Sequence, residues 1–249
     1  MHTMSIKKQI KRVACALLAM CALTGVWGAQ DAHAEESPIY GAFELKVGTY
    51  TPSIDDEFTS PGPYETFFGT DSTLHLEMEW SAYFIQNIGK LGAGLSIGYA
   101  SDTGDVQVAT AGADVSEVPG ETVFTTIPLR ASLIYRYDYS ALHHGIPLVP
   151  VVKLGLDYVF WDVEDGDGDT AAFDGTNGEG AKAGWHAALA LHLLLDFIDN
   201  PASAYMDMTW GVNNSYLFAE YMYTNINDFG GAGFDLSDDI WMFGLAFEF

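Results

Sequence analysis

The chain has little positive charge: 10 Lys and Arg residues stand against 34 Asp and Glu residues, a formal net charge of −24 over 249 residues. Such a balance repels polyanions and excludes nucleic-acid binding. Cysteine is scarce as well, because Cys15 and Cys21 are the only two. Both lie in the first 34 residues, so the rest of the chain has no thiol for a disulfide, a cysteine-based metal site or a nucleophile.

Residues 1–34 have the three parts of a secretory signal peptide. Four basic residues lie within positions 7–12, an apolar run follows at 13–26, and Ala32-His33-Ala34 supplies the A-x-A cleavage pattern. The apolar run is too short for a stable membrane-spanning helix. We therefore predict that residues 1–34 are a cleaved signal peptide and that residues 35–249 form one mature domain.

Long apolar runs are absent after this segment: none reaches the roughly 18 residues that a transmembrane helix needs. Apolar residues instead alternate with polar or small ones at period 2, which is typical of strands. Within 73–84, for example, Leu76 and Met78 fall on one face and Glu77 and Glu79 on the other. We predict eight strands by this pattern, at 39–50, 73–84, 90–100, 122–137, 147–161, 181–197, 209–224 and 239–249.

The connections between these strands alternate in length. Four are long, Gly-rich and acidic, two are short, and the moderate one at 198–208 begins with the signal for a short helical turn; the long ones are 51–72, 101–121, 162–180 and 225–238, and the short ones 85–89 and 138–146. An even number of strands with this alternation predicts an all-β fold, a transmembrane antiparallel up-and-down β-barrel of eight strands. The short turns and both termini then lie in the periplasm.

One face of each predicted strand is apolar and free of charge, which favours contact with lipid over a soluble barrel with a charged exterior. Aromatic residues gather near the strand ends, as in the two interfacial girdles of membrane proteins. Tyr50, Tyr158 and Trp241 are examples at one rim, and Trp80 and Phe247 at the other. The alternative is a set of core aromatics in a globular protein.

The opposite faces carry the charged residues. Eight strands enclose a lumen that side chains can just fill, and an unpaired charge buried there is costly. We therefore predict a lumen network, in which three glutamates pair with Arg130, Lys153 and Lys182. Its residues are Glu44, Lys46, His75, Glu77, Glu79, Arg130, Lys153, Asp157, Lys182, His186 and Glu220, and Arg136, His192 and Glu248 also face inward. The alternative is a polar ion path through the lumen.

The histidines do not indicate an enzyme. His186 and His192 are six residues apart on one predicted strand, too far to share a metal ion, and their depths do not suit a common nucleophile–base pair. We predict no catalytic residues and no cofactor.

The acidic loop at 162–169 resembles a calcium loop, but it lacks the EF-hand glycine after the third acid, and Thr176 stands where the bidentate glutamate belongs. Asp165, Asp167 and Asp169 remain weak candidates for a metal ion, beside the simpler interpretation of a solvated acidic loop.

The last strand carries apolar residues at every second position and ends on an aromatic one; these residues are Trp241, Phe243, Leu245, Phe247 and Phe249. It resembles the C-terminal assembly signal of bacterial outer-membrane proteins, which the barrel-assembly machinery recognises. More narrowly, stretches 125–130, 154–158 and 218–221 resemble an uncharacterised outer-membrane β-barrel family of myxobacteria and related bacteria. That resemblance implies a fold and a location in the cell outer membrane, and no activity.

Two functions follow from these features. The first is a structural or interaction barrel with a plugged, salt-bridged lumen and acidic extracellular loops; the alternative is a narrow porin-like channel or transporter for a small or amphipathic solute. The expected partners are outer-membrane lipid, lipopolysaccharide and the assembly machinery. Because the loops have almost no Lys or Arg, contact with anionic sugars would need bridging divalent cations.

Overall fold

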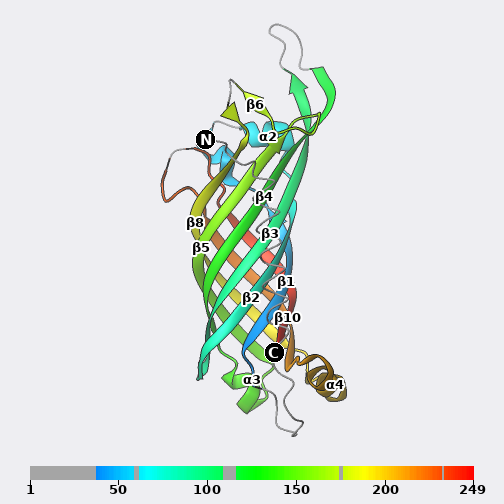
Figure 1. Ribbon diagram of the computed structural model, residues 1–249, viewed down its shortest axis with the longest axis vertical. Helices are drawn as coiled ribbons and strands as arrows, with labels where there is room; N and C mark the ends of the chain where they lie inside the picture. The colour runs from blue at the N-terminus through cyan, green and yellow to red at the C-terminus, as the bar shows by residue number, and fades with distance from the viewer. Residues whose placement is uncertain (1–37, 59–61, 109–115, 174–175, 232) are drawn as a thin grey trace, which may run out of the picture. The chain divides into compact units, whose positions relative to one another are not determined.

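The computed structural model describes residues 38–58, 62–108, 116–173, 176–231 and 233–249, so the predicted signal peptide lies outside the described residues. Eight long strands form a closed antiparallel barrel in the order β1-β10-β9-β8-β5-β4-β3-β2 (Figure 1). Their bounds are β1 Gly41–Tyr50, β2 Thr73–Asn87, β3 Gly89–Val108, β4 Ser116–Arg136, β5 Leu148–Glu164, β8 Glu179–Leu194, β9 Asn214–Asn225 and β10 Asp238–Glu248. The predicted eight-stranded up-and-down barrel is confirmed. Among the described residues, no helix is long and apolar enough to cross a membrane.

The first and last strands close the barrel. β1 and β10 pair antiparallel over seven residue pairs that begin with Ala42 opposite Glu248. The carbonyl oxygen of Phe249 accepts hydrogen bonds from the amides of Tyr40 and Gly41 at 2.8 and 3.0 Å, and the Phe249 amide donates to the Gly41 carbonyl at 3.1 Å. Closure satisfies the backbone groups that an open sheet would leave unpaired at its edges.

Side chains alternate across the barrel wall as predicted. Leu154 and Leu156 on β5 are 58% and 62% exposed, whereas Lys153 between neighbouring outward positions is 1% exposed. The apolar side chains therefore form an exposed outer belt, and the charged ones lie inside. One predicted rim aromatic is wrong: Tyr50 faces inward, and its hydroxyl donates to the Leu236 carbonyl at 3.0 Å.

The connections contain more regular structure than predicted. The connection after β1 holds a 3-10 helix, η1 (Ser53–Glu57), and helix α2 (Pro63–Phe68), and the predicted short turn at 138–146 holds α3 (Tyr139–His144). Two short strands, β6 (Ala172–Phe173) and β7 (Thr176–Asn177), pair in the loop after β5. Figure 1 shows α2 at the end of the barrel opposite α3 and α4.

The predicted bounds differ from the structure most at two places. Most of 101–121 is not a loop, because β3 and β4 continue as a paired ribbon to Val108 and from Ser116. Backbone pairing needs no apolar face, so the lipid-facing alternation ends before the strands do. The strand predicted at 209–224 begins only at Asn214, because helix α4 (Asn200–Trp210) occupies the preceding residues.

Candidate functional site: the barrel lumen

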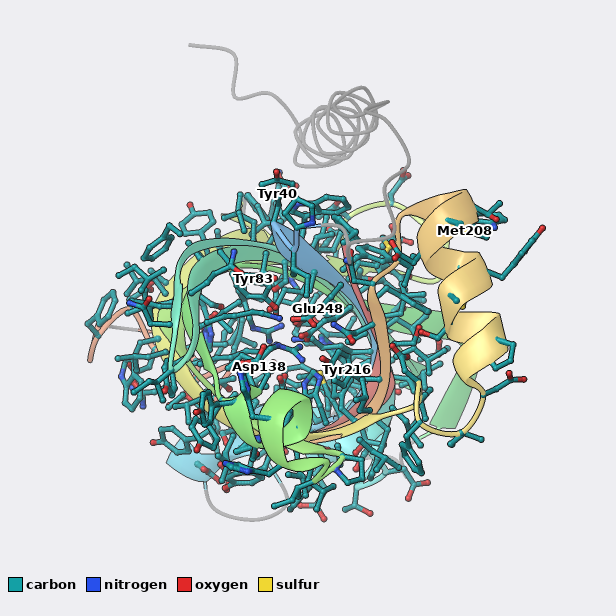
Figure 2. The ribbon with its side chains drawn as sticks, turned by 90° about the horizontal axis from the view of Figure 1, so that it is seen from below. Tyr40, Tyr83, Asp138, Met208, Tyr216 and Glu248 are labelled. Carbon is teal, nitrogen blue, oxygen red and sulfur yellow. The ribbon has the colours of Figure 1, made fainter. Side chains whose placement is uncertain are left out.

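Polar side chains from all eight strands are buried on the inner side of the barrel. All eleven residues of the predicted network are buried. Figure 2, which looks up from the end of the barrel where α3 and α4 lie, shows side chains inside the ring of strands, among them the labelled Glu248 and Tyr216. The contacts form three sets. The central cluster surrounds Lys46 and Lys153; the upper chain links Arg130, Asp157, His186 and Ser132; the lower group surrounds Lys90 and Glu248.

Lys46 lies at the middle of the central cluster. Its Nζ donates to Glu79 at 2.6 Å and to Glu77 and Glu220 at 3.1 Å each. The Lys46 side chain is fully buried. A single ammonium has three N–H donors, so Lys46 uses all of them on carboxylates from two other strands.

Lys153 is the second cation of this cluster. Its Nζ lies 2.6 Å from Glu44, 3.0 Å from Glu79 and 3.0 Å from Glu220. Glu79 and Glu220 are thus shared by both lysines, which joins strands β1, β2, β5 and β9 through the lumen. Such bridging restricts several side chains at once and compensates their desolvation.

On the side of the central cluster that faces the α2 end of the barrel, Arg130 lies between two carboxylates. Its Nη1 donates to Glu77, and its Nε lies 3.3 Å from Asp157 Oδ1. His75 Nε2 lies 3.5 Å from Glu77 Oε2. Arg130 therefore connects the central cluster to Asp157 on β5.

Asp157 also ends a chain of hydrogen bonds that crosses three strands. Ser132 Oγ lies 3.0 Å from His186 Nε2, and His186 Nδ1 lies 2.7 Å from Asp157 Oδ1. Gly155 lies between Ser132 and His186 in the sheet, and a Cβ there would collide with the His186 ring. The order serine, histidine, aspartate is that of a hydrolase triad.

This arrangement was missed at the sequence level, where His186 was compared only with His192. Pairing Ser132 with His186 requires the register of β4, β5 and β8, which alternation alone does not give. The His186 side chain is fully buried. A small lumen cavity of about 10 Å³ is not lined by Ser132, His186 or Asp157. It is lined by Tyr50, His75, Thr126, Pro128, Arg130, Val159 and Ile226.

The lower group lies in the lumen at the end of the barrel where α3 and α4 are found. Lys90 Nζ lies 2.7 Å from Asp138 and 3.0 Å from Glu248, and the Tyr216 hydroxyl donates to Glu248 at 2.9 Å. Arg136 Nε lies 3.6 Å from Glu248. Sequence reasoning missed Lys90, which follows the predicted turn at 85–89, and Asp138, which begins the one at 138–146, because a charge at a turn usually indicates solvent.

Lys182 has a different partner from the predicted one. Its Nζ lies 2.9 Å from Asp228 in the loop after β9, and hydrogen bonds from the Ala183 amide and from Lys182 lower the pKa of Asp228. Glu220 pairs with Ala190 on β8, and Lys182 lies eight positions along the same strand from Ala190. At about 3.3 Å per residue, Lys182 is therefore roughly 25 Å from the level of Glu220. Lys46 takes the role that we predicted for Lys182.

An apolar cap lies above the upper chain. Tyr64 of α2 is buried against Phe124 on β4, with ring centroids 5.9 Å apart, in one cluster with Val159, Ile226 and Leu236. The Tyr64 hydroxyl donates to Asp102 at 2.7 Å. Val159 and Ile226 also line the small cavity, so the cap lies next to it.

The weak metal candidates do not converge on a common point. Asp165 Oδ1 accepts hydrogen bonds from the amides of Asp167 and Asp169 at 3.1 and 3.2 Å, so it stabilises its own turn. Within the described part of the chain, no group of three or more His, Cys, Asp or Glu side chains is placed to hold a metal ion.

Titration of the purified, chelator-treated protein with Ca²⁺ should therefore give no saturable heat in calorimetry up to about 1 mM, the range of weak extracellular calcium modules. Asp165 already accepts two backbone hydrogen bonds, and metal binding would compete with them. A saturable heat that Asp165→Asn abolishes would contradict this prediction and establish a calcium loop.

The residues of the predicted assembly signal lie on one face of β10 and at the chain end. Trp241, Phe243 and Leu245 are exposed on the outer belt. The Phe249 ring lies 4.9 Å from the Trp80 ring, centroid to centroid. The final strand therefore presents a continuous apolar face to the outside.

No family model matches the sequence, and no curated protein matches it either. Among solved structures, the chain is similar to Ail, the attachment invasion locus protein of Yersinia pestis in complex with the heparin analogue sucrose octasulfate, with 12% identity, a TM-score of 0.42 and coverage of 84% of this chain and 99% of that one. Neisserial surface protein A is 12% identical, with a TM-score of 0.42 and coverage of 85% of this chain and 97% of that one. The N-terminal β-barrel domain of Pseudomonas aeruginosa OprF is 13% identical, with a TM-score of 0.36 and coverage of 85% of this chain and 100% of that one.

Likeness at these values transfers no function to the chain. Its own geometry is the stronger observation: a closed eight-stranded barrel, an exposed apolar belt and a charged interior. This distribution is the reverse of a soluble barrel and is typical of a barrel surrounded by lipid. The protein is a closed eight-stranded β-barrel of the kind that spans an outer membrane.

Proposed function

We propose that the protein is a structural or interaction barrel whose lumen is plugged by its own side chains and whose acidic loops face outward. One observation carries this proposal: Lys46 and Lys153 share Glu79 and Glu220 at 2.6–3.1 Å across the lumen, and all four are buried. An ion crossing this level would have to displace these pairs and leave charges uncompensated.

The ends of the lumen support the same proposal. Tyr64 and Phe124 cap one side, and the Lys90–Glu248 pair occupies the other. The cavity of about 10 Å³ has room for about one water molecule. A path for a small or amphipathic solute, the alternative function, would need a wider opening or an exit through the wall.

Purified protein inserted into planar lipid bilayers should therefore show no steady conductance. A Tyr64→Ala variant, which removes the cap only, should also stay closed, because the Lys46–Lys153 level remains. A known porin, prepared in the same detergent, serves as the positive control for conductance. Stable single-channel steps from the unmodified protein would contradict the plugged lumen, and mass spectrometry for bound lipid or solute would then test the transport function.

We infer that the Ser132–His186–Asp157 chain is structural and that the protein is not an enzyme. A triad acts on a substrate that reaches the serine hydroxyl, and Ser132 is buried beside a fully packed histidine. The chain instead satisfies three polar groups that the lumen would otherwise bury unpaired.

The partners of the barrel remain proposals. The exposed residues Asp165, Asp167 and Asp169 support contact with lipopolysaccharide through loosely held divalent cations in the solvent, since carboxylates alone repel its phosphates. The outer face of β10 supports recognition by the barrel-assembly machinery. The resemblance to the myxobacterial family stays a prediction.

A further inference from the structure

Helix α4 lies outside the ring of strands, at the end of the barrel where the chain terminates (Figures 1 and 2). It carries a stripe of four exposed residues, Pro201, Ala204, Tyr205 and Met208. Their spacing of three, four and seven residues places them on one side of the helix. Met208 is 82% exposed and Tyr205 is 61% exposed. Among the described residues, none covers this apolar side of α4.

The flanks of the helix extend the uncovered surface. Phe197 and Ile198 precede α4 and are 56% and 66% exposed, and Trp210 at its last position is 77% exposed. Leu191 of β8 and Leu217 of β9, the two strands that α4 joins, are exposed in the lipid belt. The apolar surface therefore runs from the belt through Phe197 and Ile198 to α4. Two acids flank this pair, Asp196 and Asp199, and each accepts a hydrogen bond from a backbone amide.

Backbone contacts fix α4 at a defined depth. The Leu195 amide donates to the Ser215 carbonyl at 2.8 Å, and the Ser215 amide donates to Asp196 Oδ1 at 3.0 Å. Ser215 pairs with Phe247 on β10, one of the aromatic residues at the periplasmic rim. The segment 195–199, which joins β8 to α4, thus begins at the level where the barrel leaves the hydrocarbon region.

The other end of α4 is held as well. Gly211 ends the helix in the left-handed conformation with φ of 68°, and the Asn213 amide donates to the Glu248 carbonyl at 2.7 Å. Both ends are therefore attached to the barrel rim. An eleven-residue helix is about 16 Å long at about 1.5 Å per residue, so it cannot move far from the membrane surface.

We propose that α4 is an interfacial anchor, which lays Tyr205 and Met208 into the phospholipid leaflet that faces the periplasm. Continuity with the lipid belt and the depth of its attachment carry this assignment. A tyrosine such as Tyr205 favours the boundary between headgroups and acyl chains, where one end of the ring is apolar and the other wet. The partner is phospholipid, in contrast to the lipopolysaccharide that the outer loops would meet.

The chemistry of α4 also defines how it binds. The segment Asn200–Trp210 contains no Lys or Arg and one acid, Asp207. Many interfacial helices add electrostatic attraction to anionic lipid, and α4 lacks the basic residues for it. Its insertion should depend on apolar burial alone and be independent of the fraction of phosphatidylglycerol.

A fluorescent label at Ala204 tests this proposal in vesicles of phosphatidylethanolamine and phosphatidylglycerol. Cys15→Ala and Cys21→Ala in the full chain leave an introduced cysteine as the only thiol. The label, nitrobenzoxadiazole, is attached to Ala204→Cys, to Leu154→Cys in the lipid belt and to Asp167→Cys in the exposed turn. Lipids with a nitroxide near the headgroup should quench the Ala204 and Leu154 labels and leave Asp167 unquenched, and aqueous iodide should quench Asp167 most.

Two comparisons make the test decisive. Tyr205→Asp with Met208→Asp should lower lipid quenching at Ala204 to the Asp167 level, while the heat-dependent gel mobility of the folded barrel stays unchanged; Tyr205→Ser with Met208→Ser replaces this pair if the charged variant does not fold. Changing the phosphatidylglycerol fraction should leave the quenching unchanged.

Three outcomes would overturn the anchor. The Ala204 label could respond like Asp167, its quenching could require phosphatidylglycerol, or it could appear only at high protein density together with Met208→Cys cross-links between copies. The last outcome would assign the stripe to a second copy of the chain.

Discussion

Lys153→Met should lower the free energy of unfolding of the barrel by about 3–5 kcal/mol, because removing one partner of a buried ion pair leaves charge uncompensated. The Lys153 Nζ lies 2.6 Å from Glu44 and 3.0 Å from Glu79 and Glu220, and the residue is 1% exposed. Methionine keeps most of the volume, so the loss measures the missing charge and not a cavity.

Urea unfolding of the refolded protein in detergent micelles, followed by tryptophan fluorescence, measures this loss. Lys182→Met is the matched control, because it makes the same substitution in the Lys182–Asp228 pair at the rim, where Asp228 has a 39% exposed side chain. Because Asp228 is partly exposed to solvent, which screens its charge, Lys182→Met should cost less than Lys153→Met. Equal effects from the two variants would contradict the view that the central cluster stabilises the barrel.

A second change separates charge from packing. Adding Glu220→Gln to Lys153→Met removes one of the carboxylates that lost its partner, while Lys46 still serves Glu77 and Glu79. The double variant should therefore be more stable than Lys153→Met alone. If it is less stable, the loss comes from packing of the lysine stem, and the electrostatic interpretation is wrong.

Alternation predicted the barrel because the membrane imposes it on nearly every strand. Leu154, Lys153 and Leu156 illustrate the rule: the pattern assigns each to a face, and the exposed fractions agree. The same pattern identified which charges face inward. It could not identify partners, because Lys46 and Lys182 look alike in an alternation pattern and differ only in depth, which depends on strand register.

The elements outside the membrane were predicted less well for a related reason. The ribbon beyond Ser101 pairs through its backbone and needs no apolar face, so no periodic signal indicates it. Helix α4 was predicted only as a short turn at its start, although Asp199 caps it by accepting from the Ala202 amide and Gly211 ends it. Local capping residues, which do not depend on lipid, were the signals available for α4.

Deleting Phe249 should remove most of the folded protein from the outer membrane. The residue supplies the carbonyl that accepts from Tyr40 and Gly41 at the seam, and its ring packs on Trp80. It also ends the stretch that resembles the outer-membrane assembly signal. The folded fraction is measured in isolated outer membranes by heat-dependent gel mobility.

Phe249→Ala separates the seam from the signal, because it keeps the backbone hydrogen bonds and removes only the ring. If the ring is part of an assembly signal, this variant should fold into detergent micelles in vitro, like the unmodified protein, and still be depleted from the outer membrane in cells. Phe249→Tyr, which keeps an aromatic end, should restore most of the cellular level. Normal membrane levels of Phe249→Ala would show that the final ring does not direct assembly, and the barrel fold, which depends on the pairing of β1 with β10, would be unaffected.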